Sequence, residues 1–160
     1  MRLRGLLVSS LLFLATPTLA AQDSAAVPAD SAELHWVVAP PILPPGATIA
    51  VVSGDPTAPG RSVIQLSMPN GYRMPPHFHP HSERVEVKQG TLLVGMGDRL
   101  DPKQTLPLAV GDTILAPAGF HHFSIAKGTT VVEVAFVGPY TITYLNAADA
   151  PRPRLFPYGY

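Results

Sequence analysis

The chain has 160 residues, with 11 basic and 11 acidic side chains, 19 prolines, 13 glycines and no cysteine. The missing cysteines exclude a disulfide framework, and the balanced charge without a basic run offers no surface for nucleic acid or an anionic membrane. We therefore expect a small molecule as the partner, and neither nucleic acid nor, after export, a membrane.

Residues 1–20 have the pattern of a secretory signal peptide. Arg2 and Arg4 precede an apolar run over residues 6–14, and small residues lead to a cleavage site after Ala20. A membrane anchor would need about twenty apolar residues, and a proline and a threonine interrupt this run too early. The sequence predicts an exported protein, periplasmic or secreted.

The rest of the chain predicts one domain between two short segments. Residues 21–33 are small, polar and without period, which predicts a flexible linker. Residues 34–150 are long enough for one domain with its own core. Residues 151–160 contain three prolines and cannot be a central strand. This tail would wrap along the domain, form a dimer contact or pack loosely.

Short strand-like stretches separated by glycine and proline follow one another through the domain, and no amphipathic helical stretch of about ten residues lies between them. This pattern predicts an all-β fold, an antiparallel sandwich or barrel. The expected strands are 35–39, 48–52, 62–67, 72–79, 84–88, 91–96, 105–108, 112–116, 121–126, 129–137 and 141–145.

Two histidines that are separated by a single residue lie on the fourth of these strands. His77 and His79 project from one face of an extended segment, because side chains alternate along a strand. Glu83 follows them, and neutral imidazoles with a carboxylate are common ligands of divalent transition metals. His81 is a further candidate, although its neighbours predict a turn. The alternative is that these are surface histidines on a loop.

A second histidine pair, His121 and His122, follows a predicted turn about forty residues later. A single strand cannot surround an ion, so a buried site needs a ligand from a distant strand. Five of the six histidines fall in these two clusters, which favours a site over scattered surface residues.

The two segments resemble the two sequence motifs of the cupin family. The first motif is matched at every position by Gly71, His77, His79, Glu83 and Gly90. The second is matched by Gly111, Pro117, Gly119 and His122, with Ala126 where the family has an asparagine that is not a ligand. The resemblance implies a double-stranded β-helix, or jelly-roll barrel. It also implies a metal site of His77, His79, Glu83 and His122, which leaves His121 out.

Three imidazoles and a carboxylate suit one divalent transition metal such as Fe, Mn, Ni, Cu or Zn. Cupins with such sites include dioxygenases, decarboxylases, isomerases and lyases, so the resemblance implies a metal-dependent enzyme, with an oxidoreductase of the dioxygenase type as one candidate. The alternatives are a non-catalytic periplasmic protein that binds a metal or a small ligand, and a structural sandwich with vestigial histidines. Cupins often pair through their outer strands, which implies a homodimer.

Strand parity predicts the apolar walls of the site, and the motif predicts positive φ at Gly90 and Gly111. The candidate wall residues are Val85, Val87, Met96, Phe120, Phe136 and Tyr144, most of which we expect to be core rather than substrate contacts. We expect Asp98 and Asp101 to lie in a solvated hairpin tip rather than to act as catalytic carboxylates.

Overall fold

The computed structural model describes residues 33–151. The predicted signal peptide, nearly all of the predicted linker and the tail after Pro151 lie outside the described residues. Within the described part, the chain forms nine strands and one short 3₁₀ helix, η1 (Ala147–Asp149). No helix in that part is long and apolar enough to span a membrane.

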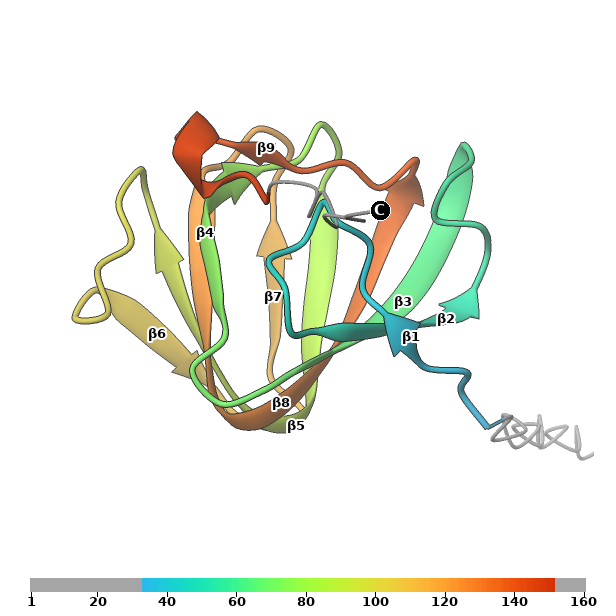
Figure 1. The fold of residues 1–160 in the computed structure, drawn as a ribbon, viewed down its shortest axis with the longest axis horizontal. Coiled ribbons are helices and arrows are strands. Elements are labelled where there is room, and N and C mark those ends of the chain that lie inside the picture. The colour runs from blue at the N-terminus through green and yellow to red at the C-terminus, as the bar shows by residue number, and fades with distance from the viewer. Residues whose placement is uncertain (1–32, 152–160) are drawn as a thin grey trace, which may run out of the picture. The chain divides into compact units, whose positions relative to one another are not determined.

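The prediction of an all-β fold is confirmed, and every strand pairing is antiparallel (Figure 1). In chain order the strands are β1 (Val37–Val38), β2 (Thr48–Ser53), β3 (Gly60–Met68), β4 (Arg73–Phe78), β5 (Glu83–Met96), β6 (Thr105–Leu108), β7 (Thr113–Ala116), β8 (His122–Gly138) and β9 (Thr143–Tyr144).

Two long strands, β5 and β8, run through both halves of the barrel. The second half of β8 pairs with β3 and with the first half of β5, which also pairs with β7. The first half of β8 pairs with β4 and with the second half of β5, which also pairs with β6. The result is the double-sheet jelly roll, in which the two sheets share β5 and β8.

Each of these long strands was expected as two separate strands. The expected strands 84–88 and 91–96 are the two halves of β5, and 121–126 and 129–137 are the two halves of β8. Gly90 and Gly128, both with φ of +74°, lie between the halves. Positive φ lets each strand bend into the second sheet without ending, since a glycine adopts it at little cost.

The core lies between the two sheets and follows the alternation of the strands. In β3, Ile64, Leu66 and Met68 are buried, while the residues between them are partly exposed. Alternate residues of β5 and β8, such as Val87 and Val134, are buried against them. Each fully buried aliphatic side chain of this kind contributes about 1.5–3 kcal/mol, and together they hold the walls that carry the site.

We expect Gly90→Ala to destabilise the fold more than Gly128→Ala. Both glycines have φ of +74°, so each substitution carries the backbone cost of about 1–2 kcal/mol. A Cβ at Gly90 would also lie 2.5 Å from the Thr129 carbonyl oxygen, whereas a Cβ at Gly128 would meet nothing within 4 Å. Urea unfolding should show a further loss of about 1–3 kcal/mol for Gly90→Ala. Equal losses would mean that the close approach to β8 does not matter.

Candidate metal centre

The four side chains of the implied metal site come from three parts of the chain and meet inside the barrel. His77 lies in β4, His79 one residue beyond it, and Glu83 and His122 are the first residues of β5 and β8. All four are at most 7% exposed. The structure therefore brings together, in the interior, the residues that the two motifs separate in sequence.

A β-bulge in β4 turns the first two histidines inward. Met74 pairs with Ser124 of β8 and His77 pairs with His122, so three steps along β4 match two along β8. The extra residue falls in the two prolines between Met74 and His77, which have no N–H to donate to a ladder. Because the bulge resets the alternation, Met74 and His77 are both buried, although strict alternation would place them on opposite faces.

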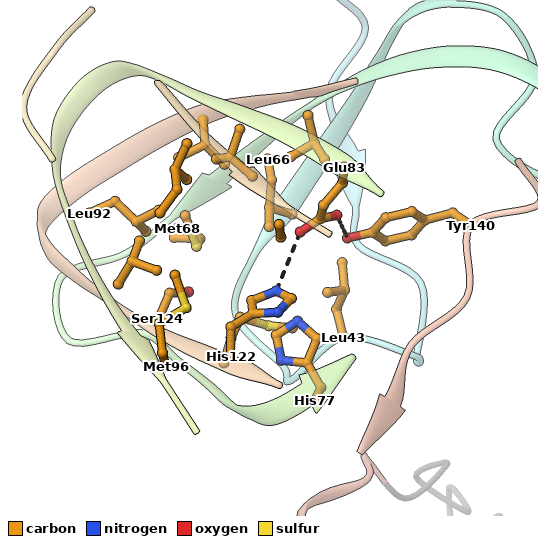
Figure 2. A pocket seen from close by; sticks show the side chains of 17 residues that line it. Leu43, Leu66, Met68, His77, Glu83, Leu92, Met96, His122, Ser124 and Tyr140 are labelled. Carbon is orange, nitrogen blue, oxygen red and sulfur yellow. Dashed lines mark hydrogen bonds and ion pairs between the residues drawn. The ribbon is translucent and has the colours of Figure 1, made fainter. Parts of the chain in front are cut away.

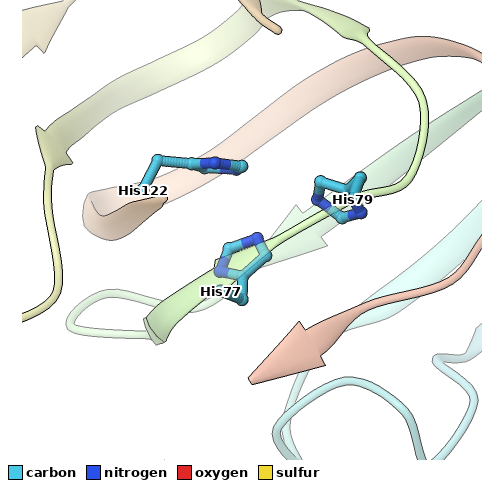
Figure 3. A group of neighbouring side chains, drawn as sticks. All are labelled: His77, His79 and His122. Atoms are coloured by element: carbon cyan, nitrogen blue, oxygen red, sulfur yellow. The ribbon is translucent and has the colours of Figure 1, made fainter. Parts of the chain in front are cut away.

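The distances are those of a shared site. One ring nitrogen from each of His77, His79 and His122 lies within 4.8 Å of one from each of the other two (Figure 3). The Oε1 atom of Glu83 lies 3.4 Å from Nε2 of His79 and 3.4 Å from Nε2 of His122. Figure 2 shows the Glu83 carboxylate directed at the His122 ring.

Backbone carbonyls orient all three imidazoles. The Nδ1 atom of His77 lies 2.7 Å from the Pro75 carbonyl oxygen. The corresponding distances are 2.7 Å from His79 to the Thr141 oxygen and 2.9 Å from His122 to the Phe120 oxygen. A carbonyl oxygen only accepts, so each Nδ1 carries the hydrogen and donates it. In the neutral ring the lone pair is then on Nε2, the arrangement found in metal-bound histidines.

Burial and charge make the group suitable for a cation. Burial, followed by the nearby His122, lowers the pKa of His77 to about 3, so this ring is neutral. Burial alone would raise the pKa of Glu83, but His122 and His79 lower it, so the carboxyl is ionised. Burial alone would lower the pKa of His122, but Glu83 and the Phe120 carbonyl raise it. One negative charge thus lies among the imidazoles.

The surroundings of the Nε2 atom of His79 indicate whether these residues fit a metal ion. It is buried and has no hydrogen-bond partner, which costs free energy unless another group satisfies it. A cation bound by all three rings would satisfy that lone pair together with the other two. The donor set, its burial and its charge therefore fit a divalent transition metal.

Tyr140 is a part of the site that the sequence motifs do not contain. Its hydroxyl lies 3.5 Å from Oε2 of Glu83 (Figure 2), and its ring stacks on that of His79 with centroids 5.3 Å apart. Burial and the Glu83 carboxylate raise the pKa of Tyr140 well above its ordinary value, so the phenol keeps its proton and donates it. No spacing signal marks this residue, because it follows β8 in a loop that carries no motif.

A cavity of about 60 Å³ adjoins the site (Figure 2). Of the six candidate wall residues, Val85 and Met96 line it and the other four do not. Val87 is fully buried in the core, Phe120 is 44% exposed, and Phe136 packs against the Tyr140 ring. The hydroxyl of Tyr144 donates to the Ile42 carbonyl. Strand parity predicts which face of a strand a side chain occupies, but it does not predict how far along the barrel that side chain lies from the site.

The remaining histidines of the two clusters lie outside the group. His81 is exposed in the turn after β4, as its neighbours predicted. The Nδ1 atom of His121 lies 2.7 Å from Oδ1 of Asp98, whose side chain is 73% exposed. Asp98 and Asp101 both lie in the polar connection between β5 and β6 and contribute nothing to the cavity.

The chain is similar to plant germin-like proteins. It is 46% identical over 65 residues to germin-like protein 9-1 of Oryza sativa subsp. japonica, which covers 39% of this chain and 26% of that protein. It is 32% identical over 113 residues to germin-like protein 4-1 of the same plant, which covers 61% of this chain and 44% of that protein. The chain thus spans less than half the length of these relatives.

Solved structures support the fold. An oxalate oxidase is 23% identical with a TM-score of 0.50, over 73% of this chain and 66% of that one. The sequence model of one family, described as Cupin, matches residues 60–148, more than half of the chain and both motifs. The chain therefore belongs to the cupin family.

Proposed function

We propose that this protein is a metal-dependent enzyme acting on a small molecule, with His77, His79, Glu83 and His122 as the ligands of one divalent transition metal. The observation that supports the proposal is the set of three imidazoles held by backbone carbonyls, with the Nε2 atom of His79 buried and unpartnered. In a surface cluster the ring nitrogens would be in contact with water. In a vestigial cluster they would accept hydrogen bonds from one another.

Each residue has a defined task in this proposal. The carbonyls of Pro75, Thr141 and Phe120 hold the rings, and Glu83 offers Oε1 to the ion while Oε2 accepts from Tyr140. When bound, the metal would supply Lewis acidity and, if it is iron, manganese or copper, an electron partner for dioxygen. Tyr140 keeps the carboxylate in one rotamer and leaves a neutral phenol beside the cavity.

The reaction class that we test first is oxidation with dioxygen. The fold shared with an oxalate oxidase is compatible with it, and no further base is required where the metal carries the chemistry. The signal-peptide pattern of residues 1–20 supports export to the periplasm or outside the cell, with the domain spanning residues 34–150. The homodimer stays a prediction from the family resemblance.

A second candidate function is non-catalytic binding of a metal or small ligand. Among the described residues that line the cavity, Glu83 is the only carboxylate and there is no lysine. A pure binding protein needs no further acid or base, so the same lining also favours this candidate.

We expect the purified protein to hold about one transition metal ion per chain after reconstitution, as measured by elemental analysis. His79→Ala or His122→Ala should lower metal affinity at least 10-fold, by the loss of a ligand. His81→Ala is the matched control, because His81 is exposed and outside the group. Equal losses in all three variants would contradict the assigned ligands.

Tyr140→Phe should weaken metal binding about 10-fold, because the Glu83 carboxylate loses the donor that orients it. Tyr72→Phe is the control: its hydroxyl donates to the Pro44 carbonyl and not to Glu83, and Tyr72 does not line the cavity. Competition with a metal-sensitive dye measures both affinities. A Tyr140→Phe protein with unchanged affinity, and with an unaltered spectrum of bound cobalt(II), would show that the phenol does not position the carboxylate.

Oxygen uptake separates the two candidate functions. With iron or copper bound, an electrode should record oxygen consumption with a catechol or a diketone, and the His122→Ala variant should abolish it. If a broad aerobic and anaerobic screen gives no turnover while ligands still bind tightly, the binding-protein function is the correct one.

A further inference from the structure

The cavity beside the proposed metal site is polar at one end and apolar elsewhere. His77, Glu83, His122 and Tyr140 form the polar end, and Ser124 is the remaining polar side chain in the lining. All other lining residues are leucine, valine, isoleucine, methionine or alanine, among them Leu66, Met68, Val94, Met96 and Val132. A ligand with a polar head and an apolar body matches this distribution.

The most exposed residue of the cavity lining lies next to the polar end. Among the described residues that line it, Met96 alone is classed as exposed, at 43%. Met96 is the register partner of His122 across β5 and β8. The deep lining, with Leu66, Met68 and Val132 each at most 6% exposed, lies inside the barrel. A ligand would therefore enter beside the metal ligands and extend its apolar body inward.

The size of the cavity limits the ligand. A water molecule needs roughly 10–15 Å³ of such volume, and its share of the liquid is about 30 Å³, so a cavity of about 60 Å³ holds on the order of four to six water molecules, the space of roughly six to nine bonded non-hydrogen atoms. This corresponds to a short aliphatic chain and not to a fused aromatic ring system.

The charge of the lining limits it further. A divalent ion together with the Glu83 carboxylate carries one net positive charge, which one carboxylate of a ligand would balance. Among the described lining residues there is no lysine or arginine. A second carboxylate would have to lie among leucine, valine and methionine side chains, where an unpaired charge costs several kcal/mol or more.

We infer that the substrate is a small chelating monoanion with a short aliphatic body, of the class of short-chain 2-oxo acids, and not a dicarboxylate. The inference rests on the proposed function, because the head group would bind the proposed metal. It separates this chain from its structural relative, whose name specifies the dicarboxylate oxalate.

Titration of the cobalt(II)-loaded protein with a matched series of acids tests the inference, with the visible spectrum of the cobalt and calorimetry as readouts. Pyruvate, 2-oxobutyrate and 2-oxovalerate share one head and differ by one methylene each. Affinity should rise about fourfold per methylene, the equivalent of about 0.8 kcal/mol. 2-Oxoglutarate has the 2-oxovalerate chain with a second carboxylate and should bind at least 10-fold more weakly.

A variant pair locates the aliphatic body. Val94→Ile adds one carbon to the lining and should remove most of the gain between 2-oxobutyrate and 2-oxovalerate. Val110→Ile is the control, because Val110 is 63% exposed and outside the lining. Equal behaviour of the two variants would contradict binding in this cavity.

The outcomes separate this inference from the proposed function. If cobalt does not bind, both fall. If cobalt binds, any one of three results overturns the substrate class and leaves the metal site standing. These results are equal affinity for 2-oxoglutarate and 2-oxovalerate, no change in affinity along the series, and no binding of any acid.

Discussion

Three hydrogen bonds from imidazoles to backbone carbonyls determine what the interior of this protein can bind. Each takes up the Nδ1 hydrogen of one histidine and leaves the Nε2 lone pair for the site. The acceptors belong to Pro75, Thr141 and Phe120, which lie in three different segments around the barrel. The orientation of the rings thus depends on backbone positions that are distant from one another in the sequence.

The group of four side chains proposed as ligands could be predicted from the sequence because its spacing follows from strand geometry. His77 and His79 share a face because of alternation, and His122 and Glu83 stand at the starts of long strands, where the motifs place them. The family resemblance then joined the two clusters, which local pattern alone leaves open. The structure brings together all four side chains that this reasoning selected.

The features that could not be predicted from the sequence depend on tertiary contacts between segments that are distant along the chain. Tyr140 reaches Glu83 from a loop after β8, and no local pattern encodes that return. Gly90 and Gly128 were natural strand ends by local rules, but tertiary pairing continues β5 and β8 through them. The cavity walls were predicted from parity, which cannot say which inward residue lies beside the site and which, like Val87, lies deep in the core.

The two prolines before His77 limit which deletions this sequence can tolerate during evolution. The extra residue in β4 is what gives Met74 and His77 the same inward direction. Loss of a single codon here would rotate the imidazoles toward solvent while leaving their order in the sequence intact. Chains with every motif histidine but one residue fewer between Tyr72 and His77 would then look like relatives and yet be unable to assemble a centre.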